Sequence, residues 1–179
     1  MKNIHMKFSK ILFLLVLTLS VISCKNNDDD TAAFNLSNAN VAGTHDLTYF
    51  TSNVTTTGSI GGQPITVTTN TTADTYQVEL TFTESGAYTI IGEFRTTTTS
   101  TLGGQPQVEI LTLDESGTYQ VNEAANTLVF IASGSSLSDS DVNSVTLFNE
   151  TELRIMFEGT YVEDGDEVIE MTELRFVRQ

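Results

Sequence analysis

Cysteine, tryptophan and positive charge are scarce in this sequence of 179 residues. It has one cysteine, Cys24, and no tryptophan. A single cysteine excludes an intrachain disulfide, so the fold must be held together by its buried core. The chain has eight basic and 23 acidic residues, and its formal net charge at pH 7 is −15. Because phosphate groups bind to cationic patches, nucleic acid is not an expected partner.

Motifs of common enzyme classes are absent as well. The chain has two histidines, His5 and His45, and it lacks the His-Glu-x-x-His, Gly-x-Ser-x-Gly and Gly-x-x-x-x-Gly-Lys patterns. Two acidic clusters, at 139–141 and 164–167, lack the spacing of an EF-hand calcium loop and favour turns instead. We therefore expect a protein that is not an enzyme and that holds no metal and no cofactor.

Residues 1–23 have the composition of a secretory signal. They contain Lys2, Lys7 and Lys10 but no acid, and the apolar run 11–17 follows the lysines. The apolar part extends over about a dozen residues, whereas a helix needs roughly 20 to cross a bilayer. We predict a signal peptide over residues 1–23 rather than a permanent membrane span.

The residues around the cysteine predict lipidation. Val21-Ile22-Ser23-Cys24 resembles a bacterial lipobox, with an aliphatic residue three positions before the cysteine and a small residue directly before it. The resemblance implies that Cys24 becomes the acylated first residue of the mature chain and anchors it in a membrane. Two or three acyl chains anchor stably, since each buried methylene contributes about 0.8 kcal/mol. The mature chain then has 156 residues (179 minus 23) and a charge of −18, from five basic and 23 acidic residues.

Residues 24–41 form the expected tether. Lys25 and the acidic run of Asp28, Asp29 and Asp30 predict a solvated, extended linker, because like charges repel one another. The run also resembles the export tether that follows the lipidated cysteine in surface-exposed lipoproteins of Bacteroidetes-type bacteria. This resemblance implies a protein that is anchored in the outer membrane and exposed at the cell surface.

From residue 42 to residue 179, apolar residues recur at every second position. Tyr76–Phe82 and Leu153–Glu158 show this alternation, and no window of similar length has an apolar stripe with a period of 3.6 residues. Since the side chains of a strand alternate between two faces, one face lies in a core and the other in water. The alternation predicts an all-β domain over residues 42–179.

Short glycine motifs predict the reversals between strands. Residues 61–64 and 103–106 share the sequence GGQP, and residues 84–86 and 115–117 share ESG. Glycine favours the positive φ of hairpin tips, so each motif predicts a turn between antiparallel strands. The order along the chain predicts a meander with both GGQP tips at one end and both ESG turns at the other.

The rest of the chain continues the pattern. The segment 66–82 is long for a single strand, so we expect a break within residues 70–74. Together the strands predict an antiparallel up-and-down meander of eight to nine strands that closes into a barrel, because closure removes the sheet edges. A β-sandwich is the alternative. Turn residues separate further strands near 127–132, 143–148, 151–162 and 167–177.

The first and last strands resemble those of lipocalin-like domains, and specifically those of small lipoproteins of Bacteroidetes-type bacteria. Gly43–Tyr49 is similar to their Gly-x-Trp opening strand, with His45 in place of the tryptophan, and Leu174–Arg178 is similar to their closing strand. The resemblance implies a lipocalin-like barrel that is open at one end, in which Arg175 or Arg178 approaches His45.

Two hypotheses about function follow. A barrel of about eight strands holds either packed side chains or one small ligand. The first hypothesis is a binding module for a small apolar or amphipathic ligand. The second is a structural protein, an adhesion or assembly subunit that contacts a protein partner through the GGQP tips or an outer face. The candidate lining residues of the binding module share one alternation phase; they are Val78, Leu80, Tyr88, Ile90 and Phe94.

Overall fold

The computed structural model describes residues 34–134 and 141–179, which belong to one compact unit that begins at Phe34. Each strand of this unit is antiparallel to the next, and the last strand pairs with the first, so the sheet closes into a barrel. The prediction of an all-β antiparallel meander that forms a barrel is confirmed. No helix within the described ranges is long and apolar enough to cross a membrane. The elements are α2 (Asn38–Val41), β1 (Gly43–Ile60), β2 (Gln63–Phe82), β3 (Ala87–Ser100), β4 (Gln107–Asn122), β5 (Thr127–Ala132), β6 (Asp141–Phe148), β7 (Glu152–Glu163) and β8 (Asp166–Arg178).

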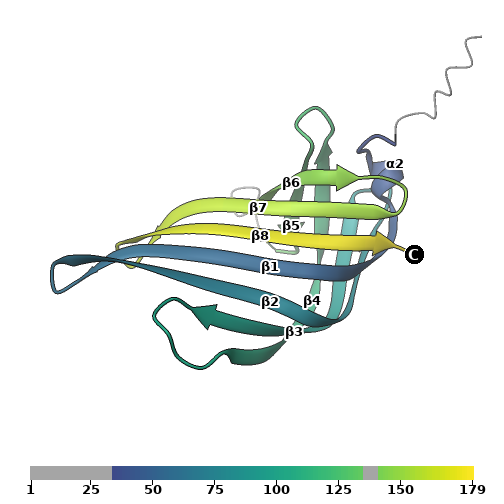
Figure 1. Ribbon diagram of the computed structural model, residues 1–179. Coiled ribbons are helices and arrows are strands. Elements are labelled where there is room, and N and C mark those ends of the chain that lie inside the picture. The colour runs from purple at the N-terminus through teal and green to yellow at the C-terminus, as the bar shows by residue number, and fades with distance from the viewer. Residues whose placement is uncertain (1–33, 135–140) are drawn as a thin grey trace, which may run out of the picture. The chain divides into compact units, whose positions relative to one another are not determined.

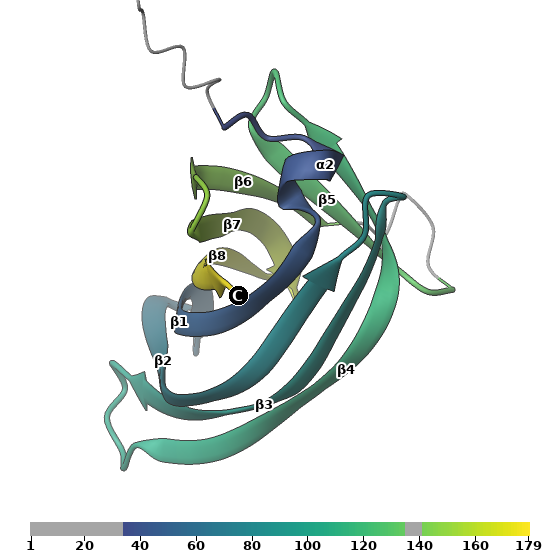
Figure 2. The ribbon, with the colours of Figure 1, turned by 90° about the vertical axis from the view of Figure 1, so that its right-hand side faces the viewer.

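Consecutive reversals lie at opposite ends of the barrel. Figure 1 shows the tips of the β1–β2, β3–β4 and β7–β8 hairpins toward one end, and α2 with the C-terminus at the other. Figure 2 looks onto the α2 end and shows the strands following one another around the barrel. Gly61 and Gly62, with φ of 59° and 80°, form the β1–β2 tip, and Gly86, with φ of 87°, closes the β2–β3 turn at the α2 end. Both GGQP segments therefore lie at the same end, as predicted.

The second ESG motif is not a turn, and this prediction was wrong. Residues 115–117 lie inside β4. Gly117 pairs with Tyr88 of β3 on one side and with Ala132 of β5 on the other. A Cβ atom at position 117 would overlap the carbonyl oxygen of Ile131. The glycine therefore permits the close approach of β5 and does not reverse the chain.

The predicted break within residues 70–74 is also wrong, because β2 continues through this segment. A bulge takes the place of the break, since the register with β3 shifts between Ala73 and Thr75. The intervening Asp74 forms an ion pair with Arg95 at 2.7 Å. A bulge accommodates an extra residue without ending a strand, which is how so long a segment stays in one sheet.

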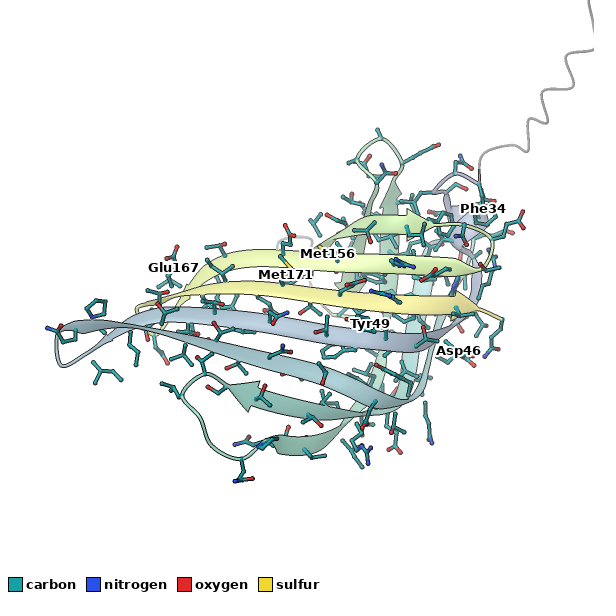
Figure 3. All side chains as sticks on the ribbon, viewed as in Figure 1. Phe34, Asp46, Tyr49, Met156, Glu167 and Met171 are labelled. Atoms are coloured by element: carbon teal, nitrogen blue, oxygen red, sulfur yellow. The ribbon has the colours of Figure 1, made fainter. Side chains whose placement is uncertain are left out.

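The segment before β1 packs onto the barrel. The sequence predicts a tether through residue 41, whereas the compact unit already begins at Phe34. Leu36 and Val41 belong to the core, with exposed fractions of 4% and 0%. The acidic run predicts a solvated chain only near the acidic residues themselves. The apolar residues that follow it are more stable when buried against the barrel than when exposed to water. Figure 3 shows Phe34 at the α2 end and Glu167 at the opposite end.

The wall of the barrel is uneven because β5 and β6 are short. β5 pairs with β4 only along residues 117–122, and β6 pairs with β7 only along residues 153–156. Residues 107–115 of β4 and 157–163 of β7 therefore have one neighbouring strand each within the described part of the chain. All strands enclose the interior near α2, whereas β5 and β6 do not contribute to the wall farther from it.

Candidate ligand-binding cavity

The barrel contains an internal cavity of about 290 Å³. Every strand from β1 to β8 contributes at least one side chain to its wall, so the cavity exists only once the barrel has closed. Ten of the thirteen lining residues are apolar, which is the composition of a site for a small apolar ligand. The lining residues are Leu47, Phe50, Leu80, Tyr88, Ile90, Phe94, Leu113, Glu115, Phe130, Asn143, Ile155, Leu174 and Phe176.

Four of the five residues predicted as ligand-lining lie in this wall. Leu80 comes from β2, and Tyr88, Ile90 and Phe94 come from β3. Leu80 and Ile90 are direct partners in the β2–β3 ladder, so their side chains lie on the same face of the sheet. The alternation phase therefore identified residues that the fold brings together.

Val78 does not line the cavity. It is buried, with 3% of its surface exposed, but it borders a separate depression of about 690 Å³ between β1 and β2. At this place the β1–β2 register is interrupted between Asp46 and Thr51. The hydroxyl of Tyr76 bridges the interruption, since it accepts from the Phe50 amide at 3.2 Å and donates to a β2 carbonyl. This depression marks the interrupted ladder rather than the interior of the barrel.

Nine lining residues were not predicted from the sequence. Most of them lie on strands far from residues 78–94 in the chain, and only the ring closure places them opposite this segment. Leu174 and Phe176 lie in the inward phase of β8, where the same alternation could have identified them. Glu115 was missed because its segment had been assigned to a turn.

Two of the polar lining residues contact each other. The hydroxyl of Tyr88 donates a hydrogen bond to the carboxylate of Glu115. Tyr88 and Asn143 are buried, with exposed fractions of 3% and 8%, whereas Glu115 is exposed. Glu115 therefore lies where the cavity meets solvent, which we call the mouth of the cavity, and Tyr88 links it to the buried wall.

Aromatic rings pack between the cavity and α2, and of these Phe130 also lines the cavity. The ring of Phe82 lies 4.7 Å from that of Tyr119 and 5.9 Å from that of Phe130, measured between centroids. The Tyr119 hydroxyl donates to the Thr83 carbonyl at 2.7 Å. Burial raises the pKa of the Tyr119 phenol, so it stays neutral and remains a donor. These contacts separate the cavity from the helix end of the barrel.

His45 lies on the α2 side of these aromatic rings and does not line the cavity. Its Nε2 donates to the Val41 carbonyl at 2.9 Å, and its ring meets Phe82 edge-on at 5.7 Å. Burial lowers the pKa of His45; the hydrogen bond to Val41 opposes this effect, and the charge of Arg178 adds to it. The neutral imidazole is therefore a packed strand residue near the closed end.

Arg178 is the residue of the last strand that approaches His45. The two are partners in the β1–β8 ladder, and the Arg178 guanidinium donates to the carbonyls of Asn40, at 2.7 Å, and Ala42. Arg175 instead lies over the Tyr49 ring, 4.2 Å from its centroid. Arg178 thus ties the segment around α2 to the end of the barrel.

No group of three or more potential metal ligands occurs among residues 34–134 and 141–179. Asp164 and Gly165 form the β7–β8 turn, with φ of 53° and 93°, so their backbone conformation is that of a tight hairpin. The other acidic cluster extends into residues 139 and 140, which lie outside the described ranges.

The predicted lipidation and export sites also lie outside the described residues. They are Cys24, Lys25, Asp28, Asp29 and Asp30. No protein-family model matches the chain, and neither a curated protein nor a solved structure is significantly similar to it.

Proposed function

We propose that this protein is a lipid-anchored binding module of the bacterial cell surface and that its barrel holds a small apolar or amphipathic ligand. The observation that carries the proposal is the cavity of about 290 Å³, which is walled by side chains from every strand and is mostly apolar. An apolar cavity favours a ligand because each methylene that leaves water contributes about 0.8 kcal/mol.

The size of the cavity limits the ligand. Sites for small molecules usually measure about 300–1,000 Å³, so this cavity, at about 290 Å³, lies just below the range. It suits one short acyl chain or one small ring system. We propose binding rather than catalysis, since the wall formed by the described residues is mostly apolar.

The residues around Cys24 support the proposed location at the cell surface. The lipobox-like Val21–Cys24 supports acylation at Cys24, and the acidic run after it supports export to the outer face of the outer membrane. Since the compact unit begins at Phe34, the tether from Cys24 comprises only the residues before Phe34. A charge of −18 on the mature chain keeps such an exposed protein soluble.

Filling the cavity tests the binding function. Ile90→Phe adds volume inside the cavity, and Ile91→Phe is the matched control, because Ile91 is the next residue on β3 and points outward with 56% exposed. The full chain carries Cys24→Ser in both cases, so that acyl chains do not compete. We expect Ile90→Phe to weaken the binding of 1-octanol at least about tenfold by isothermal titration, and Ile91→Phe to leave it within about twofold.

Circular dichroism checks that both variants remain folded. If the parent chain binds neither 1-octanol nor any of a panel of small hydrophobic molecules, the binding function is wrong and the barrel is a filled core. An equal effect of the two substitutions would likewise contradict binding inside the cavity.

A further inference from the structure

We propose that the cavity selects amphipathic ligands with a positively charged head group, which is held at Glu115, over ligands with an anionic head group. This inference rests on the proposed binding function and adds the chemical class of the ligand. In the proposed pose, the head group lies at the mouth and the apolar tail lies among Ile90, Phe94 and Leu113.

Among the described residues that line the cavity, Glu115 is the one with a formal charge. It lies in the inward phase of β4, two positions from Leu113, and its ladder partner on β3 is Ile90. Its carboxylate is therefore next to apolar wall on one side and to solvent on the other. A charge in such a position interacts more strongly with a ligand charge than a fully solvated one does.

The strand arrangement leaves this carboxylate accessible. β5 begins to pair with β4 only at Gly117, so the edge of β4 at Glu115 has no neighbouring strand within the described residues. A carboxylate offers about four lone-pair sites, and the Tyr88 hydroxyl occupies one of them. The hydrogen bond from Tyr88 orients the carboxylate at the mouth, and further acceptor sites remain for a head group.

No arginine is positioned to neutralise Glu115 or to receive an anionic head group. The described residues contain four arginines and no lysine. Arg95, Arg154 and Arg175 form ion pairs with Asp74, Glu152 and Glu173 respectively. Arg178 donates to backbone carbonyls near α2. A carboxylate or sulfate at the mouth would therefore meet a like charge, whereas an ammonium group would meet an opposite one.

Three probes that differ only in the head group test this inference. Octylammonium, 1-octanol and nonanoate, which share an octyl tail, are titrated into the full chain with Cys24→Ser at low and at moderate salt. We expect octylammonium to bind at least about fivefold more tightly than 1-octanol, and nonanoate to bind more weakly than 1-octanol. Added salt should reduce the difference, because it screens the charge at the mouth.

Glu115→Gln removes the charge and keeps the shape. We expect it to abolish the preference for octylammonium over 1-octanol, which is read as the ratio of the two affinities measured in the same variant. Glu109→Gln is the matched control, because it removes the same charge from the same face of β4 about 20 Å away, outside the cavity wall. We expect the control to keep the preference, which separates binding at Glu115 from general attraction to an acidic protein.

The outcomes test the head-group selectivity separately from the proposed binding in the cavity. If the three probes bind equally well and Ile90→Phe weakens all of them, the binding function stands and the head-group selectivity is wrong. If octylammonium keeps its preference in Glu115→Gln, or if nonanoate binds most tightly, the role of Glu115 is wrong. If none of the three binds, both proposals fall.

Discussion

His45 is a buried side chain that keeps one ring nitrogen without a partner. Its exposed fraction is 1%, its Nε2 donates to the Val41 carbonyl, and its Nδ1 has no hydrogen-bond partner within the described part of the chain. A buried polar atom without a partner is unfavourable, and a second proton on the ring would add a buried charge beside Arg178. The fold therefore requires the neutral imidazole.

Acidification should destabilise the protein through His45. Burial lowers the pKa of its imidazole from the ordinary value of 6.5, so the unfolded chain binds the proton more readily than the folded one. The contribution of His45 to stability is fully present at a pH above its ordinary pKa of 6.5. It is lost as the pH falls below 6.5 and through the lowered pKa of the folded state. We expect the urea midpoint to decrease between about pH 7 and about pH 5, followed by circular dichroism.

His45→Phe is the control for this titration. It keeps an aromatic ring beside Phe82 but leaves the Val41 carbonyl without its donor, so the comparison is between slopes with pH and not between absolute stabilities. We expect a shallower decrease in the variant. An unchanged slope would assign the pH dependence to other groups.

At the scale of elements, the segment from Phe34 to α2 is part of the barrel. Its apolar residues cover the end of the core, and Arg178 of β8 donates to the Asn40 carbonyl within the short helix and to the Ala42 carbonyl after it. The ring of Phe34 lies 4.8 Å from that of Phe148 at the end of β6. A short helix of this size has little stability of its own, so these tertiary contacts hold it in place.

Leu36→Ala tests whether this segment supports the fold. Leu36 is 4% exposed, and its truncation should lower the free energy of unfolding by about 2–4 kcal/mol through lost burial and the space left behind. Leu102→Ala is the matched control, because Leu102 lies in the β3–β4 loop with 66% exposed and should change stability by less than about 0.5 kcal/mol. Urea unfolding measures the free energy of unfolding of both variants. Equal losses of stability would show that residues 34–41 belong to the tether and do not support the fold.

The strand elements also explain where sequence-based prediction succeeds and fails. Alternation predicted β5, β7 and β8 within a few residues, because the orientation of side chains in a strand is a local property. It failed at residues 115–117, where ESG has the composition of a turn but lies in β4 between two paired neighbours. Whether a glycine turns the chain or admits a neighbouring strand depends on residues that are distant in sequence.

At the scale of the whole molecule, the proposed anchor and the charge act together. In the proposed function, acyl chains on Cys24 would hold the protein at a membrane, and the excess of acidic residues discourages association between copies. The barrel closes its sheet through the β1–β8 pairing, which removes two edges that would otherwise pair with other chains. Together these features suit a protein that works singly at a surface.

Cys24→Ser tests the anchor directly. We expect it to abolish incorporation of a labelled fatty acid into the chain in the host, because the serine hydroxyl cannot replace the thiol in the acylation that a lipobox implies. Thr31→Ala, seven positions along the tether, is the control and should leave incorporation unchanged. Labelling that persists in Cys24→Ser would remove the lipid anchor from the proposed function.

The sequence by itself determined the fold class, the strand phases, most reversals and four of the five candidate lining residues, because all of these depend on neighbours within a few positions. Only the tertiary structure decided that Leu36 and Val41 close one end, and that Glu115 stands at the mouth of a cavity beside Tyr88. Both results depend on ring closure, and the second depends also on the short lengths of β5 and β6. These are long-range properties, since they follow from which strands meet and not from the residues of any one strand.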